Sequence, residues 1–272
     1  MLIDSHAHLN FEAFDKDWRE VISSCQKEKV WMINVGAQLQ TSRKAVEIAN
    51  EYKAGVYAAV GLHPIHVIGS TYHPEEFNVD NYRDLIKSSS KVVAIGETGL
   101  DFFHSDKNID NQKKIFAEHT KVASNCNLPL IIHNRNSKDG KQDACKELLI
   151  ELKKLKQSAK GVIHSFSGTI EQALDFIQLG YFIGLNGIIT FDKTGKSEEL
   201  VKALPLESII IETDCPYLTP EPKRGQRNRP ENVLLVAEKI AEIRGLSYNK
   251  IEKQTVENAI NLFNLPLKPS WE

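Results

Sequence analysis

Two histidines one residue apart, His6 and His8, follow the first apolar run of the chain. Alternate side chains of an extended segment point to the same side, so these two imidazoles can share one divalent cation. Two surface histidines on a strand would give the same pattern. The metal-site interpretation of the pair is favoured because later strand-like runs also end in an acid or a histidine. These later residues are Glu97, His133, His164 and Asp214.

Short aliphatic or β-branched runs alternate with longer helical patterns along the chain, and these runs are the expected strands. They recur about every 20 to 40 residues, which is the length of a strand plus its crossover helix. The expected strands are Leu2–His6, Val30–Val35, Val56–Gly61, Val92–Glu97, Leu130–His133, Gly161–His164, Tyr181–Leu185 and Ser208–Glu212.

Helical periodicity fills the segments between the expected strands. Apolar residues share one stripe within Asp143–Leu155, while the lysines of that segment face elsewhere. A similar stripe lies within Ile115–Ala123. Pro230 suits the first turn of a helix that runs to Arg244. A last helix, at about Lys250–Phe263, is expected to cover the outside of the fold.

Repeated strand–helix alternation within 272 residues predicts an α/β protein, a single (β/α)8 TIM barrel at residues 1–265 with a short tail at 266–272. An open doubly wound sheet is the alternative, and the absence of a Gly-rich phosphate-binding motif disfavours it. The active site of such a barrel lies at the C-terminal ends of its strands. The histidines and acids that end the strands therefore converge on one rim.

Four histidines and two carboxylates are too many ligands for one tetrahedral zinc ion and suit two cations. Two such cations can polarise a phosphoryl or carbonyl oxygen and lower the pKa of a water between them. Asp214 is the expected acceptor of that water's proton, so Asp214 and Glu97 are the expected catalytic carboxylates. The expected ligands are His6, His8 and Asp214 for the first ion, His133 and His164 for the second, and Glu97 as the bridge.

Charge and cysteine content limit the classes of function. The formal net charge of −2 does not predict a broad basic surface for gripping duplex DNA, although a local basic patch is compatible with it. The four cysteines form no C-x-x-C pair and are expected to be reduced. Neither a secretory leader nor an apolar run of about 18 residues is visible. We therefore expect a cytoplasmic protein with no membrane partner and no obligate protein partner.

Several motifs resemble the signatures of the TatD family. Members of that family are metal-dependent deoxyribonucleases with amidohydrolase-type barrels. The resemblance extends from Met1 to about Leu265, and 224–230 resembles the family's loop before its last-but-one helix. The motifs that carry the resemblance are Asp4-Ser5-His6-Ala7-His8, Gly61-Leu62-His63-Pro64, Gly96-Glu97-Thr98-Gly99-Leu100-Asp101, His164-Ser165-Phe166-Ser167-Gly168 and Glu212-Thr213-Asp214-Cys215-Pro216-Tyr217-Leu218.

The resemblance implies that the six candidate ligands above hold two divalent metal ions and that DNA, with RNA as a second candidate, is cleaved from a chain end as by an exonuclease. It implies Mg²⁺ as the activator, whereas the imidazole-rich ligands favour Zn²⁺ or Mn²⁺. Glu97 stands where related two-metal barrels carry a carbamylated lysine. The alternatives are a two-metal amidohydrolase-type enzyme that acts on a C–N or ester bond, and a protein that binds metals without catalysis.

Candidate substrate contacts lie beside the predicted ligands. The imidazole of His63 and the guanidinium groups of the arginines suit phosphate, and Asp101 is expected to support a metal ligand. Structural ion pairs or a solvated charge cluster would explain the arginines equally well. His66, His73, His104 and His119 are expected in loops or on helix surfaces. A Lys-rich stretch after His133 departs from the family pattern. The candidate contacts are His63, Asp101, Arg135, Arg224 and Arg227.

Overall fold

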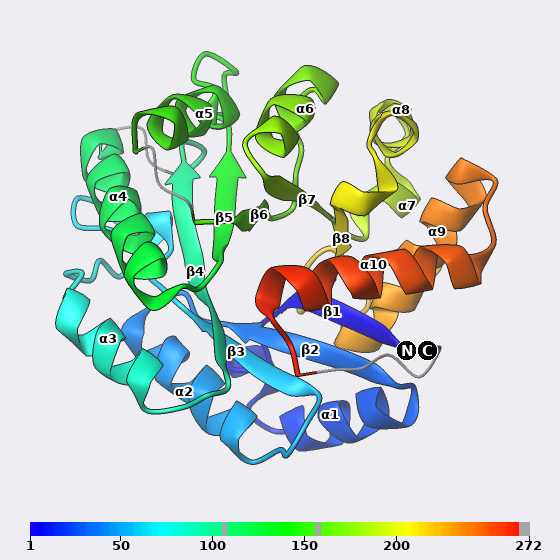
Figure 1. The fold of residues 1–272 in the computed structure, drawn as a ribbon, viewed down its shortest axis with the longest axis horizontal. Helices are drawn as coiled ribbons and strands as arrows, with labels where there is room; N and C mark the ends of the chain where they lie inside the picture. The colour runs from blue at the N-terminus through cyan, green and yellow to red at the C-terminus, as the bar shows by residue number, and fades with distance from the viewer. Residues whose placement is uncertain (105–107, 156–158, 267–272) are drawn as a thin grey trace.

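Parallel strands follow one another in chain order around an eight-stranded sheet, each hydrogen-bonded to the next (Figure 1). The computed structural model describes residues 1–104, 108–155 and 159–266. The strands are β1 (Leu2–Ala7), β2 (Val30–Val35), β3 (Val56–Val60), β4 (Val92–Asp101), β5 (Leu130–Arg135), β6 (Gly161–Ile163), β7 (Tyr181–Leu185) and β8 (Ile209–Ile211).

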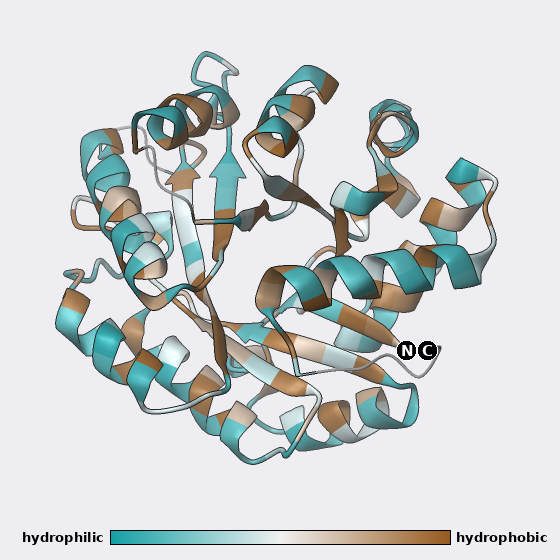
Figure 2. Ribbon diagram, viewed as in Figure 1, coloured by the Kyte–Doolittle hydropathy of each residue, from teal (hydrophilic) through white to brown (hydrophobic). Residues whose placement is uncertain are grey.

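Helices surround the strands and bury their apolar faces against them (Figure 2). The helices are α1 (Trp18–Lys27), α2 (Leu39–Asn50), α3 (Val79–Lys87), α4 (Ile109–Cys126), α5 (Ala144–Leu155), α6 (Ile170–Gln178), α7 (Ile188–Phe191), α8 (Lys196–Ala203), α9 (Val233–Arg244) and α10 (Tyr248–Phe263), with 3₁₀ turns η1 (Glu12–Phe14), η2 (Pro64–His66), η3 (Leu206–Ser208) and η4 (Pro230–Asn232).

Main-chain contacts between β1 and the segment after β8 close the sheet into a barrel. The Asp214 amide donates to the His6 carbonyl oxygen at 2.9 Å, and the His8 amide donates to the Cys215 carbonyl oxygen at 3.0 Å. Ala7 and Cys215 form a parallel bridge at the same place. The predicted TIM barrel is therefore confirmed, and its seam runs through the predicted metal ligands.

Alternate residues of each strand face the barrel interior. Ile131 and Val162 lie in one buried cluster with Ile3, whereas residues on the other face of the sheet pack in a larger cluster with the helices. His133 is two residues after Ile131, and His164 is two residues after Val162. Because side chains alternate along a strand, both imidazoles face the interior.

β4 is longer than the sequence predicts, since it continues past Glu97 to Asp101. After a shift in register it pairs with β5 from Thr98 to Asp101. This pairing needs glycine at position 99, where φ is +140° and a Cβ would lie 2.1 Å from the His133 carbonyl oxygen. Glu97 and Asp101 therefore come from one strand. The bounds of several other strands differ from the prediction by one or two residues at an end.

The last helix, α10, does not lie on the outside of the barrel as predicted. Its residues Val256, Ala259 and Phe263 belong to the same cluster as the interior residue Ile3. The Asn258 side chain donates to the Ile209 carbonyl oxygen at the start of β8, at 2.7 Å. α10 crosses in front of the strands in Figure 1 and covers the barrel at the strands' N-terminal ends. The apolar interior residues at that end of the barrel would otherwise contact water. Packing against α10 buries them, which explains its placement.

Three further expectations concern a membrane span, the tail and the cysteines. Within the described ranges, no helix has the length and apolar character needed to cross a membrane. The predicted tail at 266–272 lies outside the described residues except for Pro266. All four cysteines are free, and three of them are buried.

Candidate metal centre

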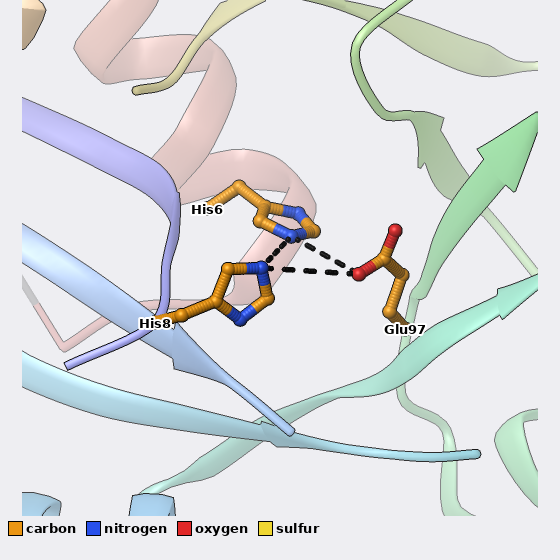
Figure 3. Close-up of side chains that lie close together, drawn as sticks. All are labelled: His6, His8 and Glu97. Carbon is orange, nitrogen blue, oxygen red and sulfur yellow. Dashed lines mark hydrogen bonds and ion pairs between the residues drawn. The ribbon is translucent and has the colours of Figure 1, made fainter. Parts of the chain in front are cut away.

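His6 and His8 at the end of β1 face Glu97 of β4 inside the barrel (Figure 3). The two Nε2 atoms lie 3.1 Å apart, and Glu97 Oε2 lies 3.4 Å from His6 Nε2 and 3.9 Å from His8 Nε2. All three side chains are buried, and the second ring nitrogen of His6 has no hydrogen-bond partner among the described residues. Two nitrogen donors and one carboxylate oxygen therefore lie within reach of one cation.

A main-chain contact determines which ring nitrogen of His8 carries the lone pair that faces this cluster. His8 Nδ1 lies 2.8 Å from the Val35 carbonyl oxygen. A carbonyl oxygen only accepts, so Nδ1 carries the proton and Nε2 keeps its lone pair. That lone pair is directed toward Glu97 and toward Asp214 Oδ1, which lies 3.4 Å away. The ring is thereby oriented as a metal ligand.

His164 has a carboxylate behind its ring. Its Nδ1 lies 2.8 Å from Glu212 Oε1, and Glu212 is fully buried. His164 Nε2 lies 3.8 Å from both Glu97 Oε1 and Asp214 Oδ1. Burial alone would lower the pKa of His164, but the charge of Glu212 and the contact with it raise that pKa to about 10. A carboxylate in this position orients a histidine ligand and makes it a stronger donor.

His133 is held between two carboxylates. Its Nδ1 lies 2.8 Å from Glu97 Oε1, and its Nε2 lies 3.0 Å from Asp101 Oδ2. Burial alone would lower the pKa of His133, but the bonds to Asp101 and Glu97 raise it to about 9. Asp101 also accepts from the backbone amide of His104 and lies 2.9 Å from its Nδ1. His133 gains a free lone pair only when one of its protons leaves.

His63 has the tautomer opposite to that of His8. The Ile65 amide donates to His63 Nδ1 at 3.1 Å, so Nδ1 carries the lone pair and Nε2 carries the proton. Burial lowers the pKa of His63 to about 4, and the ring is therefore neutral at pH 7. His63 Nε2 lies 3.3 Å from Glu97 Oε1. Although His63 lies close enough to group with Glu97 and His133, it presents an N–H rather than a lone pair.

Both carboxylates at the centre are held in the ionised form. Burial alone would raise the pKa of Glu97, but the imidazoles of His63 and His6 and the bond from His133 bring it well below its usual value. Burial would also raise the pKa of Asp214, and the neighbouring histidines again outweigh this effect. The charge that favours cations therefore lies at the middle of the rim.

A buried network beneath the rim positions Asp214. The Thr213 amide and hydroxyl donate to the two carboxylate oxygens of Asp4, at 2.9 and 2.6 Å. Asp214 itself has a φ of +57°, in the left-handed region that aspartate and asparagine enter more easily than most residues. Together with the barrel seam, this network points the Asp214 side chain toward His8.

The structure brings all six predicted ligands together at one end of the barrel, and their assignment to metal ions stays a prediction. The mixture of imidazoles and ionised carboxylates fits divalent cations. His164 lies closer to His6 than to its predicted partner His133, with ring centroids 3.5 Å and 6.5 Å apart, respectively. The two predicted sets of ligands are therefore not spatially separate groups.

A cavity of about 700 Å³ opens above these ligands. His63, Asp101 and Arg135 line it, and their role as substrate contacts stays a prediction. The other predicted arginines do not line the cavity. Arg224 lies 3.9 Å over the Phe191 ring and donates to a carbonyl oxygen, and Arg227 pairs with Asp17. Their role as substrate contacts stays untested, and internal partners occupy both side chains.

Sequence reasoning missed several residues that shape the site. Glu212 and Asp4 act behind the ligands, and Tyr217 lines the cavity with 55% of its surface exposed. Their positions within the predicted motifs were the only available signal. The prediction for His119 is wrong, since this helical residue is buried. It accepts from the Leu62 amide at 3.0 Å and supports the segment after β3.

Comparisons with known proteins agree with this geometry. The family model described as TatD related DNase matches residues 3–264. The uncharacterized metal-dependent hydrolase YabD of Bacillus subtilis is 39% identical, with 97% of this chain and 100% of that protein covered. The crystal structure of the TatD homologue YjjV of Escherichia coli has a TM-score of 0.86 and 30% identity, with 97% of this chain and 98% of that chain covered. The crystal structure of a hydrolase of the TatD family from Entamoeba histolytica has a TM-score of 0.80 and 24% identity, with 96% of this chain and 97% of that chain covered. This similarity supports the fold alone.

Proposed function

The chain belongs to the TatD-related DNase family, and from that premise we propose that it is a metal-dependent hydrolase that cleaves phosphodiester bonds of DNA from a chain end. RNA is the second nucleic acid to be tested. One observation carries the proposal. Lone pairs and carboxylates suited to cations, an N–H donor and a guanidinium group with no ion pair to a described residue share one open cavity. Each of these groups has a separate role in phosphodiester hydrolysis.

Two divalent cations held by His6, His8, Glu97, His133, His164 and Asp214 would supply Lewis-acid chemistry to the phosphoryl group and its attacking water. Asp214 accepts the proton of that water, since its Oδ1 borders the cavity and its pKa keeps it ionised. The water oxygen forms a bond to phosphorus as the bond to the leaving oxygen breaks.

His63 and Arg135 act on the phosphate from the other side of the cavity. The Nε2–H group of neutral His63 forms a hydrogen bond to the leaving oxygen and stabilises its developing charge, and that oxygen takes a proton from solvent water and ends the reaction as a hydroxyl. Arg135 lies two residues after His133 on β5, so its guanidinium group extends to the same side of the sheet and binds a non-bridging phosphate oxygen. The products are a nucleotide and a shortened strand.

The decisive experiment uses single-stranded DNA labelled at either end, with chelated protein and a series of Mg²⁺, Mn²⁺ and Zn²⁺. Release of labelled nucleotides from one end, dependent on added metal, is the expected result. A parallel panel of RNA, carboxylic esters and cyclic amides tests the other substrate classes. Hydrolysis of an amide or ester without any nucleic-acid cleavage would overturn the proposal in favour of an amidohydrolase-type activity.

A further inference from the structure

A second cavity, of about 410 Å³, adjoins the cavity above the metal ligands. We call it the side cavity. His104 lines both cavities, and Asp101 links His104 to His133 of the candidate metal centre. The residues that line the side cavity are Phe102, Phe103, His104, Ser137, Lys138, Asp139, Lys141 and Gln142. A ligand held at the metal centre can therefore extend into the side cavity.

Two cations, Arg135 and Lys138, contact the Phe103 ring at this junction. The guanidinium carbon of Arg135 lies 3.9 Å from the ring centroid, and Lys138 Nζ lies 4.7 Å from it. Among the residues that the structure describes, no carboxylate lies within ion-pair distance of either cation. The aromatic ring holds both charges in place without neutralising them.

The loop that carries Lys138 is ordered by its own hydrogen bonds. Asp139 accepts from the Ser137 hydroxyl at 2.8 Å and from the Lys141 amide at 3.1 Å. Asn136 accepts from the Ala144 amide at the start of α5, at 2.7 Å. Lys141 also forms an ion pair with Asp139, whereas Lys138 pairs with no acid in the described part of the chain. This loop is the Lys-rich stretch in which the sequence departs from the family pattern.

We propose that the side cavity binds the phosphate of a neighbouring nucleotide when the phosphate to be cleaved lies at the metal centre. This inference rests on the proposed function and specifies its substrate as a strand with at least two phosphates. Arg135 lines the cavity above the metal ligands, where it holds the phosphate to be cleaved, and the ammonium group of Lys138 in the side cavity suits the neighbouring phosphate. Because both cations lie over Phe103, they favour phosphate binding over stacking of a base on that ring.

The test compares three substrates with the metal-loaded enzyme. One is a thymidine p-nitrophenyl phosphodiester with a single phosphate, and the other two carry one further phosphorylated nucleotide on the 5′ or the 3′ side. The wild-type kcat/KM is expected to be about tenfold higher for one of the two longer substrates. Lys138→Gln removes this advantage through KM, and Lys138→Arg restores it. Each lost contact to a single strand also lowers the slope of log(kcat/KM) against log salt by about 0.7.

A matched control removes one positive charge elsewhere on the same part of the chain. Lys153→Gln on α5 is expected to leave the substrate ratio and the salt dependence unchanged. The inference is overturned if neither longer substrate is preferred, or if the preference survives in Lys138→Gln. Hydrolysis of the single-phosphate substrate reports on the proposed function separately. Failure to hydrolyse any of the three substrates with any metal would overturn both.

Discussion

His8 at the end of β1 and His63 after β3 both face Glu97, yet the main chain gives their rings opposite tautomers. A carbonyl oxygen behind His8 leaves a lone pair directed inward, whereas an amide behind His63 leaves an N–H directed inward. Residue type and distance to Glu97 do not reveal this difference. The hydrogen-bond partner of the outer ring nitrogen reveals it, because a backbone N–H always donates and a backbone carbonyl oxygen always accepts.

The difference extends to the two regions from which these histidines come. On the side of β1 and β8, main-chain pairing at the barrel seam and the buried acids Asp4 and Glu212 support the ligands. On the side of β3 to β5, the ring nitrogens of His63 and His133 direct protons at carboxylates. The first region is therefore suited to holding a cation, and the second to holding and donating protons.

Removal of the proton acceptor on the cation-holding side should have the largest effect. We expect Asp214→Asn to lower kcat by about 10³-fold, because the amide cannot accept the proton of the attacking water. Asparagine tolerates the left-handed backbone at this position, so the thermal unfolding midpoint should match that of the wild type. Turnover close to the wild-type rate would contradict the assigned role.

A pair of variants tests the two tautomers directly. His8→Ala should lower the content of bound metal, whereas His63→Ala should leave that content unchanged and lower kcat by about 10²-fold. Elemental analysis of the purified proteins gives the metal content, and the labelled-DNA assay gives kcat. Equal loss of metal from both variants would show that His63 is a ligand and would end the comparison.

Glu212→Gln should weaken metal binding by about 10- to 100-fold, because Glu212 orients His164 and makes it a stronger donor. Titration of the chelated protein with metal measures the affinity. Glu207→Gln, in the η3 turn just before β8, changes an acid to its amide outside the cluster of ligands and is the control. Unchanged affinity in Glu212→Gln would mean that the contact with His164 only fills space.

The smallest effect concerns His119, which supports the segment that carries His63. Burial lowers the pKa of His119 to about 4, below the value of about 6.5 in an unfolded chain. The unfolded state therefore takes up a proton first, and stability is lost as the pH falls from 6.5 toward 4. Between pH 7 and pH 5.5 this amounts to about 1 kcal/mol.

His119→Gln should remove that part of the pH dependence. Urea unfolding at both pH values, with the difference between wild type and variant taken at each, isolates the contribution of His119. A constant difference across this range would show that His119 is not buried in the neutral form.

Much of the barrel was predictable because its strands carry alternating or continuous apolar residues that end in polar ones. The placement of α10 was not predictable in this way, since an apolar helix face fits the outside of a barrel as well as its open end. The gathering of the six candidate ligands on one rim was predictable from residue type at strand ends. The tautomers of His8 and His63 were not, because they depend on Val35 and Ile65, whose relevant atoms belong to the main chain. His119 was placed wrongly because histidine is usually exposed, whereas this one lies on the buried apolar face of α4 with Phe116 and Val122.

The seam of the barrel has a consequence for protein synthesis. His6 and His8 are synthesised some 200 residues before Asp214 and the main-chain groups that pair with them. A nascent chain or a fragment that ends before β8 lacks the proposed proton acceptor and the hydrogen bonds that align β1. The proposed nuclease therefore becomes active only when the barrel is complete.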